Sequence, residues 1–316
     1  MIRLDNVSKQ YSNRAVVDGL SLTCAVGKVT VLVGPSGCGK TTTLEMINGL
    51  TNTDSGSIYI SDQKLSDANV LSLRRQIGYV IQDVGLFPHY SLYDNIAVVP
   101  RLLKWDEARI QTRVEEMMTL VGLPTARLRE FPAVLSGGQQ QRIGFARALA
   151  ADPGYLLLDE PFSALDPITR ITLQDEFLAI QQKLAKTAVL VTHDMDEALR
   201  LGDSVAIMHN GKILQHASPI EILRRPENAF VESFVGEERN MHLLKLLTVS
   251  QVLNAQEKSD LNASDENSEI KPSATLHQAI DKLITSSGSG LNVLDGQQHC
   301  GVITLRDIIN FTRKED

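Results

Sequence analysis

A glycine-rich segment at residues 34–42, GPSGCGKTT, constrains the fold more than any other part of the chain. It follows an apolar, β-branched run at 29–33 and precedes 44–47, which predicts a helix. The order strand, loop and helix, with the spacing GxxxxGKT, is that of a P-loop that wraps around phosphates. A glycine-rich turn that binds nothing is disfavoured, because every fixed residue of the motif is present in this context.

The chemistry of such a loop predicts binding of a nucleoside triphosphate with Mg²⁺. Backbone N–H groups point inward at the phosphates, and the following helix adds the positive end of its dipole. We expect Lys40 to reach the β- and γ-phosphates and the Thr41 hydroxyl to hold Mg²⁺. The nucleotide-binding residues predicted here are Gly34, Pro35, Ser36, Gly37, Cys38, Gly39, Lys40, Thr41 and Thr42.

Bulk composition excludes several other classes of protein. A net charge of −7 argues against a nucleic-acid binder that depends on neutralising phosphates. Three cysteines (Cys24, Cys38 and Cys300) lie far apart, which predicts a reducing compartment and no disulfide framework. No apolar run has the roughly 18 residues of a membrane helix, and the N-terminus does not resemble a signal peptide. The chain is therefore expected in the cytosol unless a partner holds it at a membrane.

The pattern of apolar residues predicts an α/β domain with a helical insertion. Residues 2–7 alternate as an outer strand would, and 16–33 contain a further strand, a turn and the strand before the P-loop. From about 85 to 151 the pattern is helical, with Asp106 as a predicted N-cap and Gly122 as a stop. The short apolar runs at Leu156–Leu158 and Ala188–Val191 are typical of buried parallel strands.

The character of the sequence changes after Gly236. Residues 254–273 are polar and acidic, which predicts a flexible linker or exposed loop. Order returns at Thr275 with a predicted helix, strands at 291–294 and 301–304, and a final short helix.

Two carboxylates end the apolar strand at 155–159. A strand end opposite the P-loop is where an Asp that orders Mg²⁺ belongs, so we assign this role to Asp159. Glu160 then lies where it would orient or deprotonate the attacking water.

A second candidate for anion binding is the segment Leu135–Gln139. Ser136 and Gln139 have the spacing of a capping box, and a well-capped helix is the simplest reading. However, Gly137 and Gly138 at a helix start would also expose N–H groups to an anion. One P-loop already encloses one triphosphate, so a second such site requires its own explanation.

Taken together, these motifs resemble the ATP-binding subunit of ABC transporters over residues 1–236. Gly34–Thr41 is similar to Walker A and Leu156–Glu160 to Walker B, while Leu135–Gln139 is similar to the ABC signature. Gln82, Ser163–Asp166 and His193 match the Q-loop glutamine, the D-loop and the switch histidine.

The resemblance implies ATP and Mg²⁺ as cofactors and a homodimer as the active form. In this family two subunits pair head to tail, so Ser136, Gly137, Gly138 and Gln139 of one copy would meet ATP held by Lys40 of the other. It also implies that Glu160 and His193 are catalytic, that Thr41, Gln82 and Asp159 hold the metal, and that Tyr11 stacks on adenine.

The implied fold is a P-loop NTPase cassette with a RecA-like core, an antiparallel β subdomain and a helical subdomain at about 85–151. A connecting segment at 237–274 leads to a small α+β domain. Residues 275–314 are similar to a single CBS motif, in which Thr304 and Asp307 match positions that contact ribose and phosphate. A CBS module normally has two motifs, so these two ligand roles are left open.

The resemblance further implies partners and a substrate class. Two separate transmembrane permease subunits would dock near Gly85–His89, a solute-binding protein outside the cytoplasm would act indirectly, and the chain would lie peripherally on the cytoplasmic side of the membrane. The sequences of segments 41–47, 79–89 and 95–100 are similar to those of importers of osmoprotectants such as glycine betaine, choline or carnitine.

Other functions remain as alternatives at this point. An importer of another small solute, such as an amino acid or other amine, fits the same motifs. A soluble ABC ATPase of DNA repair would carry a long coiled coil between Walker A and the signature, and a translation factor would carry two cassettes; neither feature is present. A purely regulatory subunit is disfavoured by intact Lys40, Asp159, Glu160 and His193.

Overall fold

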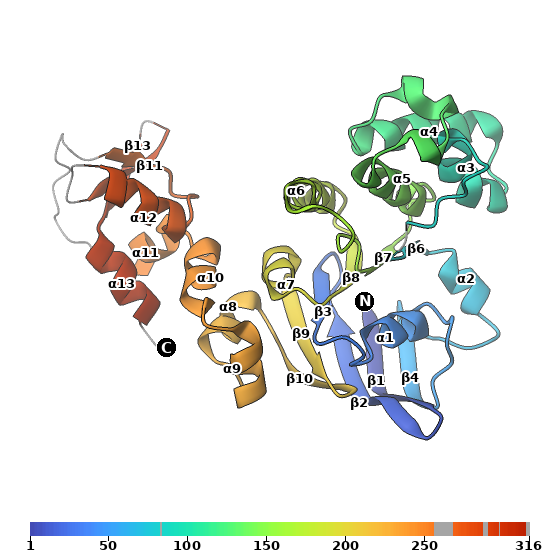
Figure 1. Cartoon of the computed structure of the whole chain (residues 1–316), viewed down its shortest axis with the longest axis horizontal. Helices are drawn as coiled ribbons and strands as arrows, with labels where there is room; N and C mark the ends of the chain where they lie inside the picture. Colours follow the sequence, from blue (N-terminus) through green and yellow to red (C-terminus); the bar gives the residue numbers. More distant parts are fainter. Residues whose placement is uncertain (83, 256–267, 287–289, 297, 314–316) are drawn as a thin grey trace. The chain divides into compact units, whose positions relative to one another are not determined.

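The computed structural model describes residues 1–313 apart from 83, 256–267, 287–289 and 297 (Figure 1). Packing divides the chain into two compact units, Met1–Pro219 and Ile220–Asp316. Each unit is described by itself below.

A six-stranded sheet forms the centre of the first unit. Its order is β10 (Lys212–Ala217), β9 (Ser204–His209), β3 (Val29–Val33), β8 (Thr187–Thr192), β7 (Tyr155–Asp159) and β6 (Ile77–Val80). All neighbours pair in parallel except β9 and β10. Every residue of β3, β7 and β8 is buried, which explains their continuous apolar sequence. The predicted buried parallel strands are confirmed.

A second sheet of four antiparallel strands has the order β2 (Arg14–Cys24), β1 (Ile2–Tyr11), β4 (Ser55–Ile60) and β5 (Gln63–Lys64). The prediction of an outer strand at residues 2–7 is wrong, because β1 lies between β2 and β4. Its alternation instead reflects burial of one face. Ile2 and Leu4 share a buried cluster with Leu157 of β7 and Val189 of β8.

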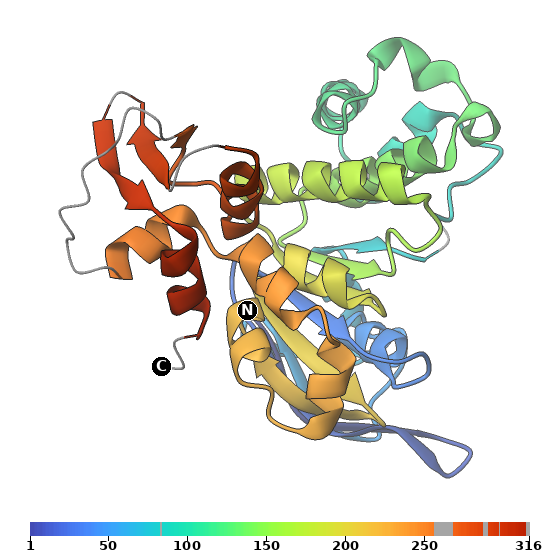
Figure 2. The same cartoon turned by 60° about the vertical axis from the view of Figure 1, so that its left-hand side comes forward.

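Helices complete this unit. α1 (Lys40–Ile47) follows β3, and α2 (Val70–Arg74) precedes β6. A helical layer contains α3 (Leu92–Leu102), α4 (Glu107–Leu120), η1 (Thr125–Arg129), η2 (Pro132–Val134) and α5 (Gly137–Leu149), and lies at the end of the unit away from α1 (Figures 1 and 2). Asp106 caps α4 by accepting from the Arg109 N–H at 2.9 Å, and Gly122 follows the helix with φ +67°, as predicted. α6 (Pro167–Leu184) and α7 (Met195–Leu201) follow β7 and β8.

The second unit begins with short helices: α8 (Pro219–Arg224, whose first residue still belongs to the first unit), α9 (Ala229–Val235), α10 (Arg239–Leu246) and α11 (Val249–Ala255). The Arg239 guanidinium donates to the carbonyls of Leu223 and Arg224, which ties α8 to α10. The Arg224 guanidinium lies 5.7 Å from the Phe311 ring centroid, so α8 also contacts the end of the chain. The division by packing therefore falls before Gly236, and the assignment of 1–236 as one functional module stays a prediction.

A three-stranded sheet with order β11 (Ser268–Ile270), β12 (Leu291–Asp295) and β13 (Gln298–Ile303) completes this unit, with α12 (Leu276–Thr285) and α13 (Leu305–Arg313). The predicted acidic linker is wrong at 268–270, because these residues pair in parallel with β12 and Ile270 is buried. Residues 256–267 of that linker lie outside the described residues. The helix and the two strands predicted after Thr275 are confirmed.

Candidate nucleotide-binding site

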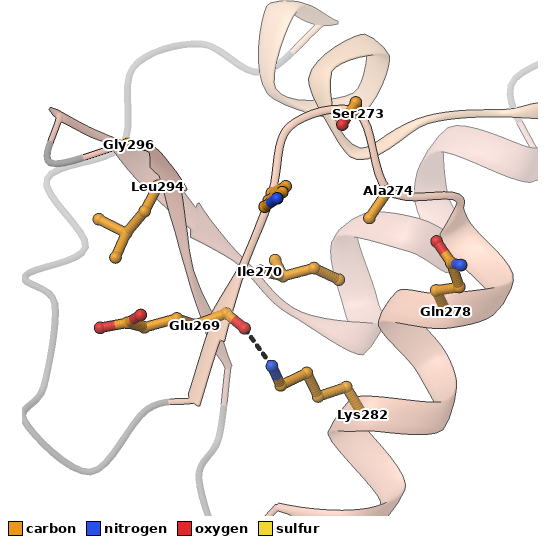
Figure 3. A pocket seen from close by; sticks show the side chains of 9 residues that line it. Glu269, Ile270, Ser273, Ala274, Gln278, Lys282, Leu294 and Gly296 are labelled. Carbon is orange, nitrogen blue, oxygen red and sulfur yellow. Dashed lines mark hydrogen bonds between the residues drawn. The ribbon is translucent and has the colours of Figure 1, made fainter.

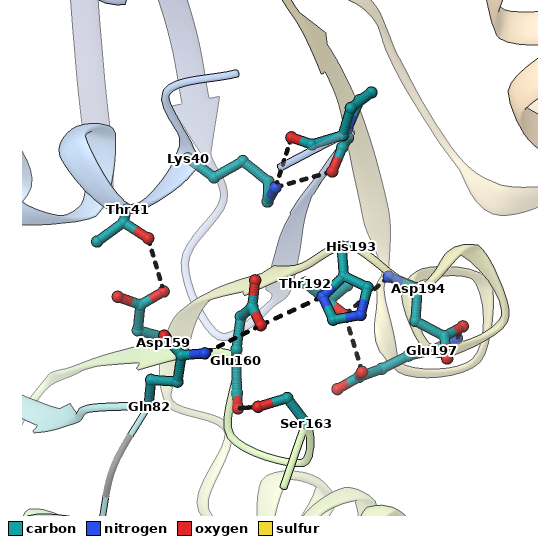
Figure 4. A network of polar contacts seen from close by, with 12 residues as sticks. Lys40, Thr41, Gln82, Asp159, Glu160, Ser163, Thr192, His193, Asp194 and Glu197 are labelled. Carbon is teal, nitrogen blue, oxygen red and sulfur yellow. Dashed lines mark hydrogen bonds and ion pairs between the residues drawn. The ribbon is translucent and has the colours of Figure 1, made fainter. Parts of the chain in front are cut away.

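The candidate site lies where parallel strands of the six-stranded sheet end. β3 leads into the P-loop, β7 ends at Asp159, and β8 ends just before His193. Registers Val33↔Thr192 and Asp159↔Val191 place these carboxyl ends side by side. Functional residues from distant parts of the sequence therefore meet at one edge of the sheet (Figure 4).

The start of α1 has no side-chain cap. Its N-cap residue is Gly39, which has φ +107° and no side chain that could accept a capping hydrogen bond. A methyl group at Gly39 would lie 2.4 Å from the Val16 carbonyl oxygen, and one at Gly34 would lie 2.0 Å from that of Met208. These glycines are required by close packing of the loop. The first N–H groups of α1 therefore lack the side-chain acceptor that most helices supply, as an anion site requires.

Backbone carbonyls hold the Lys40 ammonium inside the loop. Its Nζ donates to the carbonyls of Gly34 at 2.7 Å and Pro35 at 3.1 Å, and it lies 3.9 Å from the Cys38 sulfur. Burial raises the pKa of the Cys38 thiol. Because the thiolate is the reactive form, this shift supports a packing role for Cys38 rather than a redox role.

Two of the three predicted metal ligands bond each other directly. Thr41 Oγ1 donates to Asp159 Oδ1 at 3.2 Å, and the third, Gln82, contacts the next residue, with its Nε2 3.4 Å from Glu160 Oε2 (Figure 4). Burial raises the pKa of Asp159, with Glu160 and Glu45 adding to the shift and Thr41 and Lys40 opposing it. A buried carboxylate, a hydroxyl and an amide oxygen are the hard ligands that Mg²⁺ takes together with phosphate oxygens. These residues fit the ion.

Glu160 contacts two other segments of the chain, one that contains Gln82 and one that contains Val191 and His193. Its backbone has φ +42°, and its N–H donates to the Val191 carbonyl at 2.9 Å. One carboxylate oxygen, Oε2, lies 3.4 Å from Gln82 Nε2 and 3.2 Å from His193 Nδ1. Hydrogen bonds from two side chains fix the orientation of this carboxylate, which suits a group that must align a water molecule.

The predicted signature residues lie elsewhere in the first unit. Ser136 Oγ accepts from the Gln139 N–H at 3.3 Å, and Gln139 Oε1 accepts from the Ser136 N–H at 3.2 Å. The capping box is confirmed. Gly138 packs on α6, because a methyl group there would lie 2.7 Å from Thr169 Cγ2. α5 belongs to the helical layer, and α1 lies beside the sheets (Figures 1 and 2). The hydrogen bonds given for Ser136 stay at the start of α5, and those given for Lys40 stay within the P-loop.

Tyr11 ends β1 with 47% of its surface exposed. Lys9 Nζ lies 5.4 Å from the centroid of its ring. The exposed ring is accessible for stacking, and its contact with adenine stays a prediction.

Several polar residues around the site were missed by the sequence reasoning. Asp194 caps α7 by accepting from the Glu197 N–H at 3.1 Å, and Thr192 Oγ1 donates to Glu197 Oε2 at 2.8 Å. Burial raises the pKa of Glu197 to about 7. The spacing Asp-x-x-Glu is a capping signal that would have identified the first pair. Arg170 of α6 also contacts Asp194, and no local pattern predicts this contact.

Two residues of the predicted docking segment, Gly85 and Phe87, line a groove of the first unit. Its volume is about 320 Å³, and it is lined by Gly85, Phe87, Val98, Val99 and Arg147, among others. Arg147 fixes the segment by donating to the carbonyls of Val84 and Gly85, each at 2.7 Å. Phe87 keeps 40% exposure at the surface.

The second unit has a cavity of its own, with a volume of about 560 Å³ (Figure 3). Its lining includes Glu269, Gln278 and Lys282, and Lys282 donates to the Glu269 carbonyl. Thr304 and Asp307 are not among the lining residues. They bond each other at the start of α13, with the Thr304 N–H 2.9 Å from Asp307 Oδ2. Their predicted contact with a nucleotide stays a prediction.

No helix in the described ranges is long and apolar enough to cross a membrane.

Comparison with known proteins agrees with this geometry. The family model described as "ABC transporter" matches residues 17–163. The chain is 44% identical to the glycine betaine uptake system ATP-binding protein YehX of Escherichia coli K12 over 98% of this chain and 99% of the relative. It is 50% identical to the osmoprotectant import ATP-binding protein OsmV of Salmonella typhimurium over 81% of this chain and 69% of the relative.

Among solved structures, the chain is similar to a dimeric post-hydrolysis state of the ATP-binding cassette MJ0796 bound to ADP and Pi. The TM-score is 0.63 at 30% sequence identity, over 69% of this chain and 99% of that one. The chain therefore resembles this cassette in fold as well as in sequence.

Proposed function

The chain belongs to the ABC transporter family, as an ATP-binding cassette with ATPase activity, and from this premise we propose that it powers uptake of an osmoprotectant such as glycine betaine, choline or carnitine through separate membrane subunits. The observation that carries the proposal is the meeting of Lys40, Asp159, Glu160 and His193 at one edge of the sheet. The names of the relatives at 44% and 50% identity supply the substrate class.

Each residue of the site has a separate role in ATP hydrolysis. N–H groups at the start of α1 and the Lys40 ammonium bind the phosphates and stabilise the charge that develops on them. Thr41, Gln82 and Asp159 would hold Mg²⁺, which neutralises phosphate charge when bound. Glu160 orients the attacking water and accepts its proton, while Gln82 and His193 keep Glu160 Oε2 in place.

We further propose that the active form is a head-to-tail homodimer. The support is that Ser136 begins a helix of the helical layer and Lys40 begins α1, and their hydrogen bonds go to different partners, although both are expected at the γ-phosphate. A second copy would bring its Ser136 to the first copy's Lys40. The cassette of similar fold was itself solved as a dimer.

The test of the site and of the dimer uses Glu160→Gln, which keeps the shape of the side chain and removes its basicity. This variant should bind ATP normally, lose most hydrolysis and elute from a sizing column as a dimer only when ATP is present. Wild-type hydrolysis by this variant would show that Glu160 is not the base. ATP binding without dimer formation would overturn the head-to-tail arrangement.

Permease subunits are proposed to dock in the groove at Gly85–His89, which would hold the chain peripherally on the cytoplasmic face of the membrane. A solute-binding protein outside the cytoplasm would act only through the permease. The exposed Phe87 ring meets His89 edge to face and lies tilted against Tyr90, with centroids 6.2 and 5.2 Å away, and offers an aromatic contact surface. Phe87→Ala is expected to leave ATPase activity of the free chain intact and to reduce its recovery with membranes that contain the permease. Unchanged recovery would place the docking surface elsewhere.

Solute identity is tested by uptake of radiolabelled betaine, choline and carnitine in a deletion strain under osmotic stress. Complementation with the wild-type chain should restore uptake of at least one, and complementation with the Glu160→Gln variant should restore none. Normal uptake of all three in the deletion strain would favour another solute, such as an amino acid.

The second unit is proposed to regulate transport rather than to catalyse it, because the predicted catalytic residues all belong to the first. Deletion of residues 237–316, which removes this unit except for α8 and α9, should spare ATPase activity and change its dependence on salt or on an adenine nucleotide in the reconstituted transporter. An unchanged response would remove the sensor role.

A further inference from the structure

Contacts around Glu160 form a closed ring that includes one residue with no role so far, Arg170. From Glu160 the chain turns through Ser163, whose Oγ donates to the Glu160 carbonyl at 2.9 Å. It reaches Leu165, whose carbonyl accepts from Arg170 Nη2 at 3.2 Å. Arg170 Nη1 then lies 3.6 Å from Asp194 Oδ2. His193, next to Asp194, closes the ring on Glu160.

Arg170 therefore joins two segments that lie next to the reacting groups. One is the loop 163–166 after Glu160, and the other is the turn between β8 and α7 that carries His193. The turn is further fixed from its far side, because Thr192 Oγ1 accepts from the Asp194 N–H at 3.1 Å and donates to buried Glu197. Arg170 is the member of this network that reaches across from α6.

The environment of Arg170 is not that of a simple stabilising ion pair. Its side chain is 31% exposed, yet its Nε atom is buried and has no hydrogen-bond partner among the described residues. A buried N–H without a partner costs free energy. A guanidinium has a rigid fork that can bond two groups at once, which a lysine ammonium does not match. The position is thus suited to fixing the distance between the Leu165 carbonyl and the Asp194 carboxylate.

We propose that Arg170 is a positioning residue for ATP hydrolysis, which holds the His193 turn against the loop 163–166 and so sets the contact between His193 and Glu160. The inference rests on the proposed hydrolytic roles of these two residues. Arg170 itself touches neither of them. It acts on their relative position, and small displacements of catalytic groups can reduce rates by on the order of 10- to 100-fold.

The chain supplies a matched control in Arg200. This residue also joins α7 to α6, through Gln174 at 3.2 Å and Asp175 at 2.6 Å, and its side chain is 35% exposed. It lies at the other end of α7 from His193. Loss of either arginine removes one tie between the same two helices, so a general loss of packing should affect both variants alike.

Steady-state ATPase activity of the full-length chain should separate the two. Arg170→Ala is expected to lower kcat by roughly 10- to 100-fold with KM within about two-fold of wild type. Arg200→Ala should keep wild-type kcat, with a similar shift in melting temperature. Arg170→Lys should recover only part of the rate, because it restores the charge and not the fork.

The decisive measurement repeats Arg170→Ala in a His193→Ala background, with radiolabelled ATP to resolve low rates. If Arg170 acts through His193, the second substitution should change the rate by less than about two-fold, because coupled residues are not additive. A full further loss in that background, or an equal loss in Arg200→Ala, would overturn the positioning role. Absence of ATPase activity in the wild type would instead refute the proposed function.

Discussion

The starts of α1 and α5 look alike in sequence and differ in the structure. α1 follows a glycine-rich loop, α5 has glycine at its first two positions, and both starts are expected to meet the phosphates of ATP. α1 begins at Gly39 without any side-chain cap, whereas α5 begins at Ser136 with a complete capping box. The first start leaves its N–H groups to a ligand, and the second has already satisfied one of them internally.

The difference assigns separate tasks to the two helix starts. We expect the start of α1 to bind phosphate through backbone N–H groups and Lys40. At α5, capping uses only an acceptor position of the Ser136 oxygen, so its hydroxyl proton remains available to a phosphate. We therefore expect α1 to govern affinity for ATP and α5 to govern the pairing of two copies.

The largest expected effect tests the open helix start. Lys40→Ala removes the cation that lies inside the loop and should reduce kcat/KM for ATP by on the order of 10²- to 10³-fold. Lys28→Ala serves as the control. Lys28 is 57% exposed, pairs with Asp203 at 2.8 Å, and lies at the opposite end of β3 from the P-loop. Its activity should match wild type. Wild-type ATP affinity and rate in Lys40→Ala would show that the P-loop is not the site.

The sequence predicted the open start of α1 well, because a P-loop depends on a short contiguous motif. It also predicted Asp159 and Glu160 at a strand end opposite the P-loop, and the resemblance to ABC cassettes added His193. The three meet because carboxyl ends of parallel strands share one edge of a sheet. The position of Ser136 relative to Lys40 in a single copy could not be read in this way. It depends on how the helical layer packs, which no spacing in the sequence determines.

Errors in the fold have similar causes. β1 alternates because one face is buried, and alternation does not distinguish an edge strand from an inner one. β11 is only three residues long and lies in an acidic stretch, so its pairing with β12 comes from the tertiary fold rather than from local preference. Arg170 was missed because its contact with Asp194 joins two elements that no local repeat relates.

A third helix start, that of α7, extends the comparison to a capped start with a buried carboxyl. Burial raises the pKa of Glu197 to about 7, while Asp194 adds to this shift and Thr192, Arg170 and His193 oppose it. Between about pH 4.5 and pH 7, Glu197 therefore stays protonated in the folded protein and is ionised in the unfolded chain. This contribution to stability is fully present below about pH 4.5, the ordinary pKa of the carboxyl, and is lost as the pH rises through about 7.

Glu197→Gln should remove this pH dependence. Between about pH 5 and pH 8, the free energy of unfolding of the wild type should fall relative to the variant by on the order of 2–4 kcal/mol. Urea titrations across that range measure the difference. Glu116→Gln is the control, because Glu116 is 55% exposed and should give the wild-type profile. Parallel profiles for wild type and Glu197→Gln would mean that Glu197 is ionised throughout.

The smallest effect on stability is expected at the capped start of α5, where it also separates capping from pairing. Ser136→Ala should lose about 1 kcal/mol of stability, as removal of an N-cap does. Ser91 caps α3 in the same way, by accepting from the Asp94 N–H at 3.1 Å, so Ser91→Ala should lose a similar amount. Placed in the Glu160→Gln chain, only Ser136→Ala should prevent the ATP-dependent dimer while leaving ATP bound. If both substitutions left the dimer intact, Ser136 would be a helix cap alone, and the two helix starts would differ only in that one binds phosphate.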